Sequence, residues 1–232
     1  MITVISLGGS IIAPNDIDIP FVTAFSDVLR RFLNEDPARK TILIVGGGGP
    51  ARSYQQAYRT LVSNPKDSDQ DWIGIMATRL NAELVRAVFE DDCSTPVVTD
   101  PTADFAFSGR ILVAAGWKPG FSTDFDAVML AERFGARRII NLSNIDKVYS
   151  ADPKLDPTAV PIDHISWDDF TTLVGTAWSP GKNTPFDPIA TQKASELDLQ
   201  VIAAGGRDLA NIEKVLRGQE FSGTTIGRKS AR

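Results

Sequence analysis

The stretch TILIVGGGGP, residues 41–50, is the most informative part of the sequence about the fold. Its first five residues form a short apolar run, typical of a strand buried on both faces of a sheet. Four glycines, Gly46 to Gly49, follow at once, which is more than any turn type requires. Pro50 then suits the first position of a helix, where its fixed φ and missing N–H are tolerated. The stretch therefore predicts a buried strand that runs through a glycine loop into a helix.

The same pattern extends in both directions along the chain. Ile2 to Leu7 is a second apolar run, and it ends at Gly8-Gly9. Further strands are expected at 96–99, 110–114, 137–142, 199–204 and 224–226, and helices at 21–32, 51–61, 71–88, 122–134, 166–174, 189–197 and 209–216. This alternation predicts an α/β protein, a three-layer αβα sandwich with a mainly parallel central sheet. Ligands of such sheets bind at the carboxyl ends of the strands, where the glycines lie.

The helix expected at 71–88 carries two further predictions. Asp71 is expected to cap its N-terminus, because a short acidic side chain accepts hydrogen bonds from the first free N–H groups. An apolar face at helical spacing is expected to pack on the core, formed by Ile73, Met76, Ala77, Leu80, Leu84 and Val88.

The composition bounds the class of protein. The chain has 232 residues, which favours one domain. Lys and Arg total 24 against 29 for Asp and Glu, and the net charge of -5 argues against a nucleic-acid or anionic-membrane partner. The one cysteine, Cys93, and the one histidine, His164, exclude an internal disulfide and disfavour a Cys- or His-based metal site. No apolar run is long enough to span a bilayer, and no secretory signal is expected, so a reduced, cytoplasmic location is predicted.

The glycine loops are the first candidates for chemistry. Glycine lets backbone N–H groups approach a phosphate closely, although Gly8-Gly9-Ser10 equally suits a plain turn. Arg52 is expected in the first turn of the helix after the second loop, where a cation opposes the helix dipole. A bound anion explains that arginine better than helix stability does, and a solvated arginine is the alternative. The spacing fits neither a Walker A loop nor a dinucleotide-binding fingerprint.

Two polar segments are the other candidates. Lys118 to Asp124 joins a cation, a Pro-Gly turn and hydroxyl groups to an expected helix N-terminus, and helix capping alone would also explain it. Asn141 to Pro153 places small polar side chains and Tyr149 after a strand. An aromatic ring beside short polar groups suits a purine base and its ribose, whereas an ordinary loop has a similar composition.

Taken together, these motifs resemble those of the amino acid kinase superfamily over nearly the whole chain, and especially those of the archaeal-type uridylate (UMP) kinases. The order and spacing carry the resemblance, since no single motif is decisive. The matching segments are Gly8–Ser10, Val45–Gly48 with Ala51–Tyr54, Asp71–Ile75 with Ala77–Ala82, Pro119-Gly120 with Ser122–Asp124, Asn144–Asp146 with Val148–Pro153, Asp187-Pro188 and Gly223–Ile226.

The resemblance implies that the protein transfers the γ-phosphoryl group of ATP to UMP, and that ATP brings the Mg²⁺ ion with it. It implies ATP contacts at Gly9, Ser10, Gly48, Arg52, Ser143, Asn144, Tyr149 and Asp152. It implies UMP contacts at Gly47, Asp71, Lys118, Pro119, Gly120, Phe121, Ser122, Thr123 and Asp124. Arg52, Asp124 and Arg207 are the catalytic candidates. A lobe at about 1–142 would bind the acceptor, a lobe at about 143–232 would bind ATP, and a homo-oligomer, commonly a hexamer, is implied.

Departures from the family pattern keep alternatives open. Ser6 stands where many members have lysine, and Arg207 is the nearest replacement, with Lys118, Lys147 and Lys182 as others. Lys147 also replaces the usual glycine of the hairpin. A kinase of another small acid or phosphate acceptor, or a non-catalytic ATP-binding storage or sensor protein resembling the molybdenum-storage subunits, is therefore an alternative.

Overall fold

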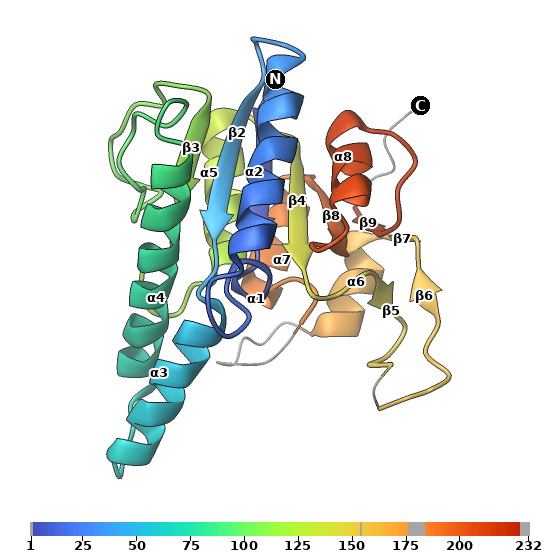
Figure 1. Cartoon of the computed structure of the whole chain (residues 1–232). Coiled ribbons are helices and arrows are strands. Elements are labelled where there is room, and N and C mark those ends of the chain that lie inside the picture. The colour runs from blue at the N-terminus through green and yellow to red at the C-terminus, as the bar shows by residue number, and fades with distance from the viewer. Residues whose placement is uncertain (1, 154, 176–183, 228–232) are drawn as a thin grey trace.

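The computed structural model describes residues 2–153, 155–175 and 184–227. Its strands are β1 (Ile2–Leu7), β2 (Lys40–Val45), β3 (Ile111–Ala114), β4 (Arg138–Ser143), β5 (Val148–Tyr149), β6 (Pro161–Ile162), β7 (His164–Ile165), β8 (Gln200–Gly205) and β9 (Thr224–Ile226). Its helices are α1 (Gly9–Ile12), α2 (Ile19–Asn34), α3 (Gly48–Leu61), α4 (Asp67–Val88), α5 (Thr123–Phe134), α6 (Trp167–Val174), α7 (Pro188–Glu196) and α8 (Leu209–Arg217). The order confirms the predicted alternation of strands and helices (Figure 1).

Seven strands form one central sheet in the order β3-β2-β1-β4-β8-β9-β7. β1 pairs in parallel with both β2 and β4, and β8 extends the parallel run beside β4. β9 is antiparallel to β8, which makes the sheet mainly rather than wholly parallel. The prediction of a mainly parallel α/β sheet is confirmed. β5 and β6 form a separate two-stranded hairpin.

Alternating strand residues feed two separate cores, one on each face of the sheet. Ile5 and Leu7 of β1 pack with α1, α2, α4 and α8, whereas Val4 packs with α5, α6 and α7. Figure 1 shows α2, α4 and α8 on the near side of the sheet, with α5 and α7 behind it. The two cores make the protein a three-layer αβα sandwich. None of the helices in the described part of the chain is long and apolar enough to cross a membrane.

Several predicted boundaries are wrong for local reasons. The segment 96–99 is not a strand, and only Val98 forms an isolated bridge, to Ala114. α4 begins at Asp67, four residues before Asp71, so Asp71 is not its cap. Acidic Asp67 and Asp69 in the first turn favour the earlier start, because they complement the helix dipole.

The loop after β2 enters its helix earlier than predicted. α3 starts at Gly48, so Pro50 occupies the third helical position rather than the first, and Arg52 lies in the second turn. The first four N–H groups of a helix have no partner within it, so proline is tolerated there too.

The predicted core-facing stripe of α4 is also wrong. Met76 is 58% exposed and Leu80 is 72% exposed. The buried face instead carries Ile75, Ala82 and Val85 together with polar residues. A helix with apolar residues on both sides has no single face that periodicity can assign to the core.

Candidate active site

The two glycine loops interlock at the carboxyl ends of β1 and β2. A Cβ atom on Gly9 would lie 2.1 Å from the backbone nitrogen of Gly48, and one on Gly46 would lie 2.4 Å from the nitrogen of Gly9. Gly48 also has a φ of +65°, in the left-handed region. The side-chain amide of Asn81 in α4 donates to the carbonyl oxygens of Gly46 and Gly47, at 2.9 and 3.1 Å. The glycines are thus needed for loop packing, whatever they bind.

A cleft of three adjoining cavities runs past these loops. The central cavity, about 580 Å³, is lined by Ser6, Gly8, Gly9, Ser10, Gly46, Gly47, Gly48, Arg52, Thr123, Asp124, Asn141, Ser143, Asn144, Ile145, Thr184 and Pro185. It shares Gly47 and Thr123 with a cavity on one side, and Asn144 and Pro185 with a cavity on the other. The shared residues make the three cavities one continuous site.

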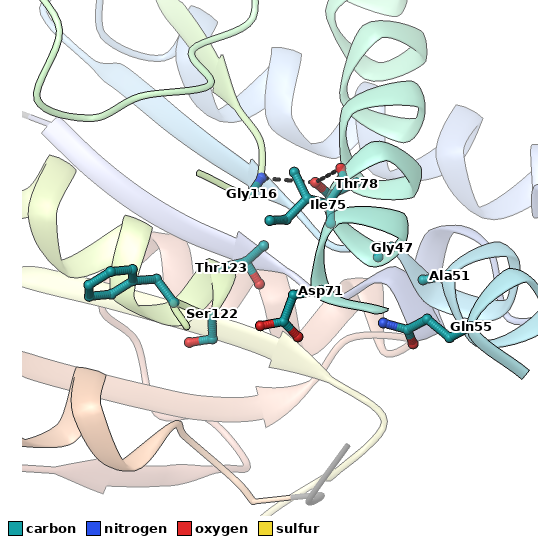
Figure 2. Close-up of a pocket in the computed structure, with 11 residues that line it drawn as sticks. Gly47, Ala51, Gln55, Asp71, Ile75, Thr78, Gly116, Ser122 and Thr123 are labelled. Atoms are coloured by element: carbon teal, nitrogen blue, oxygen red, sulfur yellow. Dashed lines mark hydrogen bonds between the residues drawn. The ribbon is translucent and has the colours of Figure 1, made fainter. Parts of the chain in front are cut away.

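The helix-side cavity, about 210 Å³, lies between α3, α4 and the segment before α5 (Figure 2). It is lined by Gly47, Ala51, Gln55, Asp71, Gly74, Ile75, Thr78, Gly116, Phe121, Ser122 and Thr123. The Asp71 carboxylate faces this space, and its partial burial raises the pKa of that carboxyl. Cavities of this kind bind small molecules through a few fixed polar groups.

Side chains of α4 hold the wall formed by residues 116–123. The Thr78 hydroxyl accepts a hydrogen bond from the Gly116 N–H at 2.8 Å, drawn in Figure 2, and itself donates to the carbonyl oxygen of Ile75. Oδ2 of Asp71 accepts from the Gly120 N–H at 3.0 Å. Arg79 donates to the carbonyl oxygen of Trp117 at 2.9 Å. This wall is therefore fixed by backbone-directed hydrogen bonds.

The hairpin-side cavity, about 460 Å³, is built mainly from turns. It is lined by Asn144, Ile145, Asp146, Lys147, Tyr149, Ala151, Asp152, Pro153, Leu173, Val174, Thr184 and Pro185. Tyr149 thus shares its cavity with aliphatic side chains, which suits one flat apolar group. The Lys147 ammonium group forms an ion pair with Asp163.

Three carboxylates gather at the start of α5 and α7. Burial and the neighbouring Asp187 raise the pKa of Asp124 to about 6, whereas the Ser6 hydroxyl, which donates to Oδ1 at 3.0 Å, lowers it. Oδ2 of Asp124 accepts from the Asp187 N–H at 3.2 Å. Burial raises the pKa of Asp126 to about 8, and Oδ1 of that residue has no partner among the described residues. Asp124 is therefore the carboxylate of this cluster that faces the central cavity.

The structure brings together most residues of the predicted site. The central cavity is lined by Gly9, Ser10, Gly47, Gly48, Arg52, Thr123, Asp124, Ser143 and Asn144, the helix-side cavity by Asp71, Phe121 and Ser122, and the hairpin-side cavity by Tyr149 and Asp152. Gly120 joins through its hydrogen bond to Asp71. Arg52 donates to the carbonyl oxygen of Pro14 at 2.7 Å.

Two other predicted cations, Arg207 and Lys118, are not among the residues lining the three cavities. Arg207 forms an ion pair with Asp18 at 2.8 Å and is not among the residues lining the central cavity. The Lys118 ammonium group lies 3.8 Å from the centre of the Trp117 ring, and neither Lys118 nor Pro119 lines the helix-side cavity. Lys182 lies outside the described residues.

Some lining residues carried no predicted role. Gln55 and Ala51 follow Gly47 at intervals of four on one face of α3, and Ile75 and Thr78 follow Asp71 on one face of α4. Helical spacing from Gly47 and from Asp71 is the sequence signal that points to them.

Comparisons with known proteins identify the family to which this chain is similar. A family model described as the amino acid kinase family matches residues 1–202. The chain is 37% identical to the uridylate kinase of Methanospirillum hungatei, over 97% of this chain and 94% of the relative. It is 35% identical to that of Methanocorpusculum labreanum, over 99% and 97%. The crystal structure of uridylate kinase from Archaeoglobus fulgidus superposes with a TM-score of 0.82 at 32% identity, covering 98% of this chain and 100% of that one.

Proposed function

The chain belongs to the amino acid kinase family, and from this premise we propose how its cleft phosphorylates UMP with ATP. The enzyme is a kinase, and its activity is the transfer of a phosphoryl group from ATP to UMP, giving ADP and UDP. The storage, sensor and other-acceptor alternatives are not favoured, because relatives named uridylate kinase match nearly the full length.

The placement of the two substrates within the cleft rests on which parts of the chain line each cavity. The helix-side cavity is lined by residues between 47 and 123, and the hairpin-side cavity by residues between 144 and 185. The central cavity draws on both groups. This supports an acceptor-binding lobe at about 1–142 and an ATP-binding lobe at about 143–232, with UMP in the helix-side cavity and the adenosine of ATP in the hairpin-side cavity.

The chemistry needs alignment and charge neutralisation more than it needs a base. An oxygen of the UMP phosphate, already anionic, attacks the γ-phosphorus of ATP. The bond from that phosphorus to the bridging β–γ oxygen breaks, and ADP leaves with the electron pair. The glycine N–H groups and the Arg52 guanidinium line the cavity where this negative charge is spread over the phosphates. Asp124, which is mostly ionised at neutral pH, orients the cationic groups around the transferred phosphoryl.

Oxygen groups of the central cavity fit a magnesium ion delivered with ATP. Among the described residues no three His, Cys, Asp or Glu side chains gather as a metal site. Mg²⁺ characteristically uses substrate phosphates and one or two carboxylates rather than a full protein cage. Asp124 is the carboxylate that would hold it, with Ser10 and Ser143 hydroxyls nearby in the same lining. When bound, the ion neutralises charge on the β- and γ-phosphates.

Arg207 is the predicted catalytic residue with the least support. Its guanidinium would have to leave Asp18 to reach a phosphate, whereas Arg52 already lines the central cavity. A surface ion pair of this kind is worth about 0–1 kcal/mol, which is a low barrier to such a movement.

We also propose that the chain works in the cytoplasm as a homo-oligomer, for which the family resemblance implies a hexamer. Large apolar side chains gather exposed on α4, and such faces mark interaction surfaces. They are Trp72, Met76, Leu80 and Leu84.

The decisive experiment measures ADP release from ATP and Mg²⁺ with UMP, CMP, acetylglutamate, isopentenyl phosphate or no acceptor. UMP is expected to support the fastest release, with little release in its absence. Tight ATP binding without turnover for any acceptor would contradict the kinase and favour a storage or sensor protein. A different best acceptor would contradict the placement of UMP in the helix-side cavity.

A further inference from the structure

Gln55 occupies the wall of the helix-side cavity at a position with no assigned role. Ala51 and Gln55 are four residues apart on one face of α3, Gly47 caps the helix four residues before Ala51, and all three line this cavity. Side chains of a helix lean towards its N-terminus, which for α3 is the end that carries the glycine loop. Gln55 is therefore a polar group directed along the cavity, unlike its exposed neighbour Gln56.

The Gln55 amide is held in one orientation. Its Nε2 atom donates to the carbonyl oxygen of Gln70 at 3.0 Å. Since a carbonyl oxygen only accepts, the nitrogen must face Gln70, which leaves Oε1 and one N–H for the cavity. Gly74 makes room for the amide, because a Cβ there would lie 2.6 Å from Nε2. The amide is thus packed and anchored before any ligand binds.

Asp71 supplies the second polar group of this wall. Both residues line the cavity, and Figure 2 shows the Gln55 amide turned towards the side on which Asp71 lies. Oδ2 of Asp71 is engaged by the Gly120 N–H, which leaves Oδ1 for a ligand. An ionised carboxylate accepts hydrogen bonds only, and the amide oxygen of Gln55 also accepts. The pair therefore suits a ligand that presents two adjacent donors, as the 2′,3′-diol of ribose does.

We propose that Gln55, acting with Asp71, is a specificity-determining residue that selects ribonucleotide over 2′-deoxyribonucleotide acceptors. The proposal rests on UMP being the acceptor in the helix-side cavity. A neutral hydrogen bond to one hydroxyl accounts for a preference of about tenfold, whereas loss of a charged partner costs more. Gln55 would thus set the size of the preference, and Asp71 would be needed for binding either sugar.

The test compares kcat/KM for UMP, dUMP and CMP in the wild type, Gln55→Met, Gln55→Ala and the matched control Gln56→Met. Methionine keeps the length of the side chain but accepts no strong hydrogen bond. We expect both Gln55 variants to lose about tenfold of the UMP-over-dUMP preference, through a higher KM for UMP with kcat and the dUMP constants little changed. Gln56→Met is expected to behave as the wild type.

Other outcomes overturn the proposal in distinguishable ways. An unchanged UMP-to-dUMP ratio, or equal losses with both, would leave UMP phosphorylation intact and make Gln55 a structural residue only. A changed UMP-to-CMP ratio with an unchanged UMP-to-dUMP ratio would move the contact to the base. A wild type that phosphorylates none of the three nucleotides would refute the proposed function and this inference with it.

Discussion

The two ends of the cleft are built in opposite ways. The helix-side cavity is walled by the long helices α3 and α4, and side chains of α4 accept hydrogen bonds from the backbone N–H groups of Gly116 and Gly120. The hairpin-side cavity is walled by turns, by a hairpin whose strands have two residues each, and by the end of α6. The first presents a few polar groups held by hydrogen bonds to the backbone, whereas the second presents Tyr149 and aliphatic side chains among the polar residues of the turns. With UMP and ATP placed as we propose, this difference predicts that the helical wall selects the acceptor, whereas the hairpin-side cavity holds a flat base.

The largest expected effect lies at the centre, where the two ends meet. Arg52→Ala should lower kcat by about 10²–10³-fold, because a cation that stabilises spreading phosphate charge is lost. Asp124→Asn should also abolish most turnover. The matched control is Arg59→Ala, an exposed arginine on the same helix. The measurement is steady-state kinetics on variants whose circular dichroism spectrum is unchanged. A near-normal kcat in either variant would contradict the proposal that phosphoryl transfer takes place in the central cavity.

A second experiment separates the two ends. Asp71→Asn should raise KM for UMP by about 10–100-fold and leave KM for ATP unchanged, since a charged hydrogen-bond acceptor contributes about 1.5–3 kcal/mol. Tyr149→Ala should do the reverse and raise KM for ATP by about tenfold, because the ring supplies mainly apolar contact. Asp67→Asn, in the first turn of the same helix as Asp71, is the control. If either variant raised both KM values equally, the division of the cleft would be wrong.

A third prediction tests how the helical wall is held. The Asp126 carboxyl accepts from the Trp117 N–H at 3.2 Å and is fully buried, and burial raises its pKa from 3.8 to about 8. The folded protein keeps this proton up to about pH 8, whereas the unfolded chain releases it near pH 4, so folding weakens as pH rises between these values. Asp126→Asn should therefore be more stable than the wild type at pH 8 and similar at pH 4.

Urea unfolding at several pH values checks this, with the exposed Asp91→Asn as control. If the free energy of unfolding changed equally with pH in the wild type and in Asp126→Asn between pH 4 and pH 8, Asp126 would be ionised in the folded state.

The smallest expected effect concerns Ser6 and Asp124. The Ser6 hydroxyl donates to Asp124 and so favours its ionised form. Ser6→Ala should raise the pKa of Asp124, and the acidic limb of the kcat/KM profile, which reports the free enzyme, should move to higher pH than in the wild type. A limb that stays in place or moves to lower pH would mean that Asp124 does not control this part of the profile.

The helix-side cavity was the harder end to predict from sequence. A glutamine in a polar helix such as α3 looks like any solvated side chain, and only the approach of Gln70 and Gly74 shows that Gln55 is held in the cavity. Arg207 is the opposite case, a predicted site residue that does not line the cleft. Its partner Asp18 lies 189 residues away in sequence, so their ion pair could not be predicted from local sequence. The hairpin-side residues Tyr149 and Asp152 were found because family motifs mark them directly.

The alternation of the main strands and helices follows from the sequence, since apolar runs that end in glycine encode local backbone preferences without reference to distant residues. The absence of a strand at 96–99 and the short elements α1 and β7 do not follow from it. The sequence also predicts that ligands bind beside those glycines, because the glycines mark the carboxyl ends of parallel strands. Which face of α4 is buried, and which polar residues meet in the cleft, became clear from the packed structure alone. Periodicity reports that a helix has an apolar face, but which neighbour covers that face depends on contacts between residues far apart in the chain.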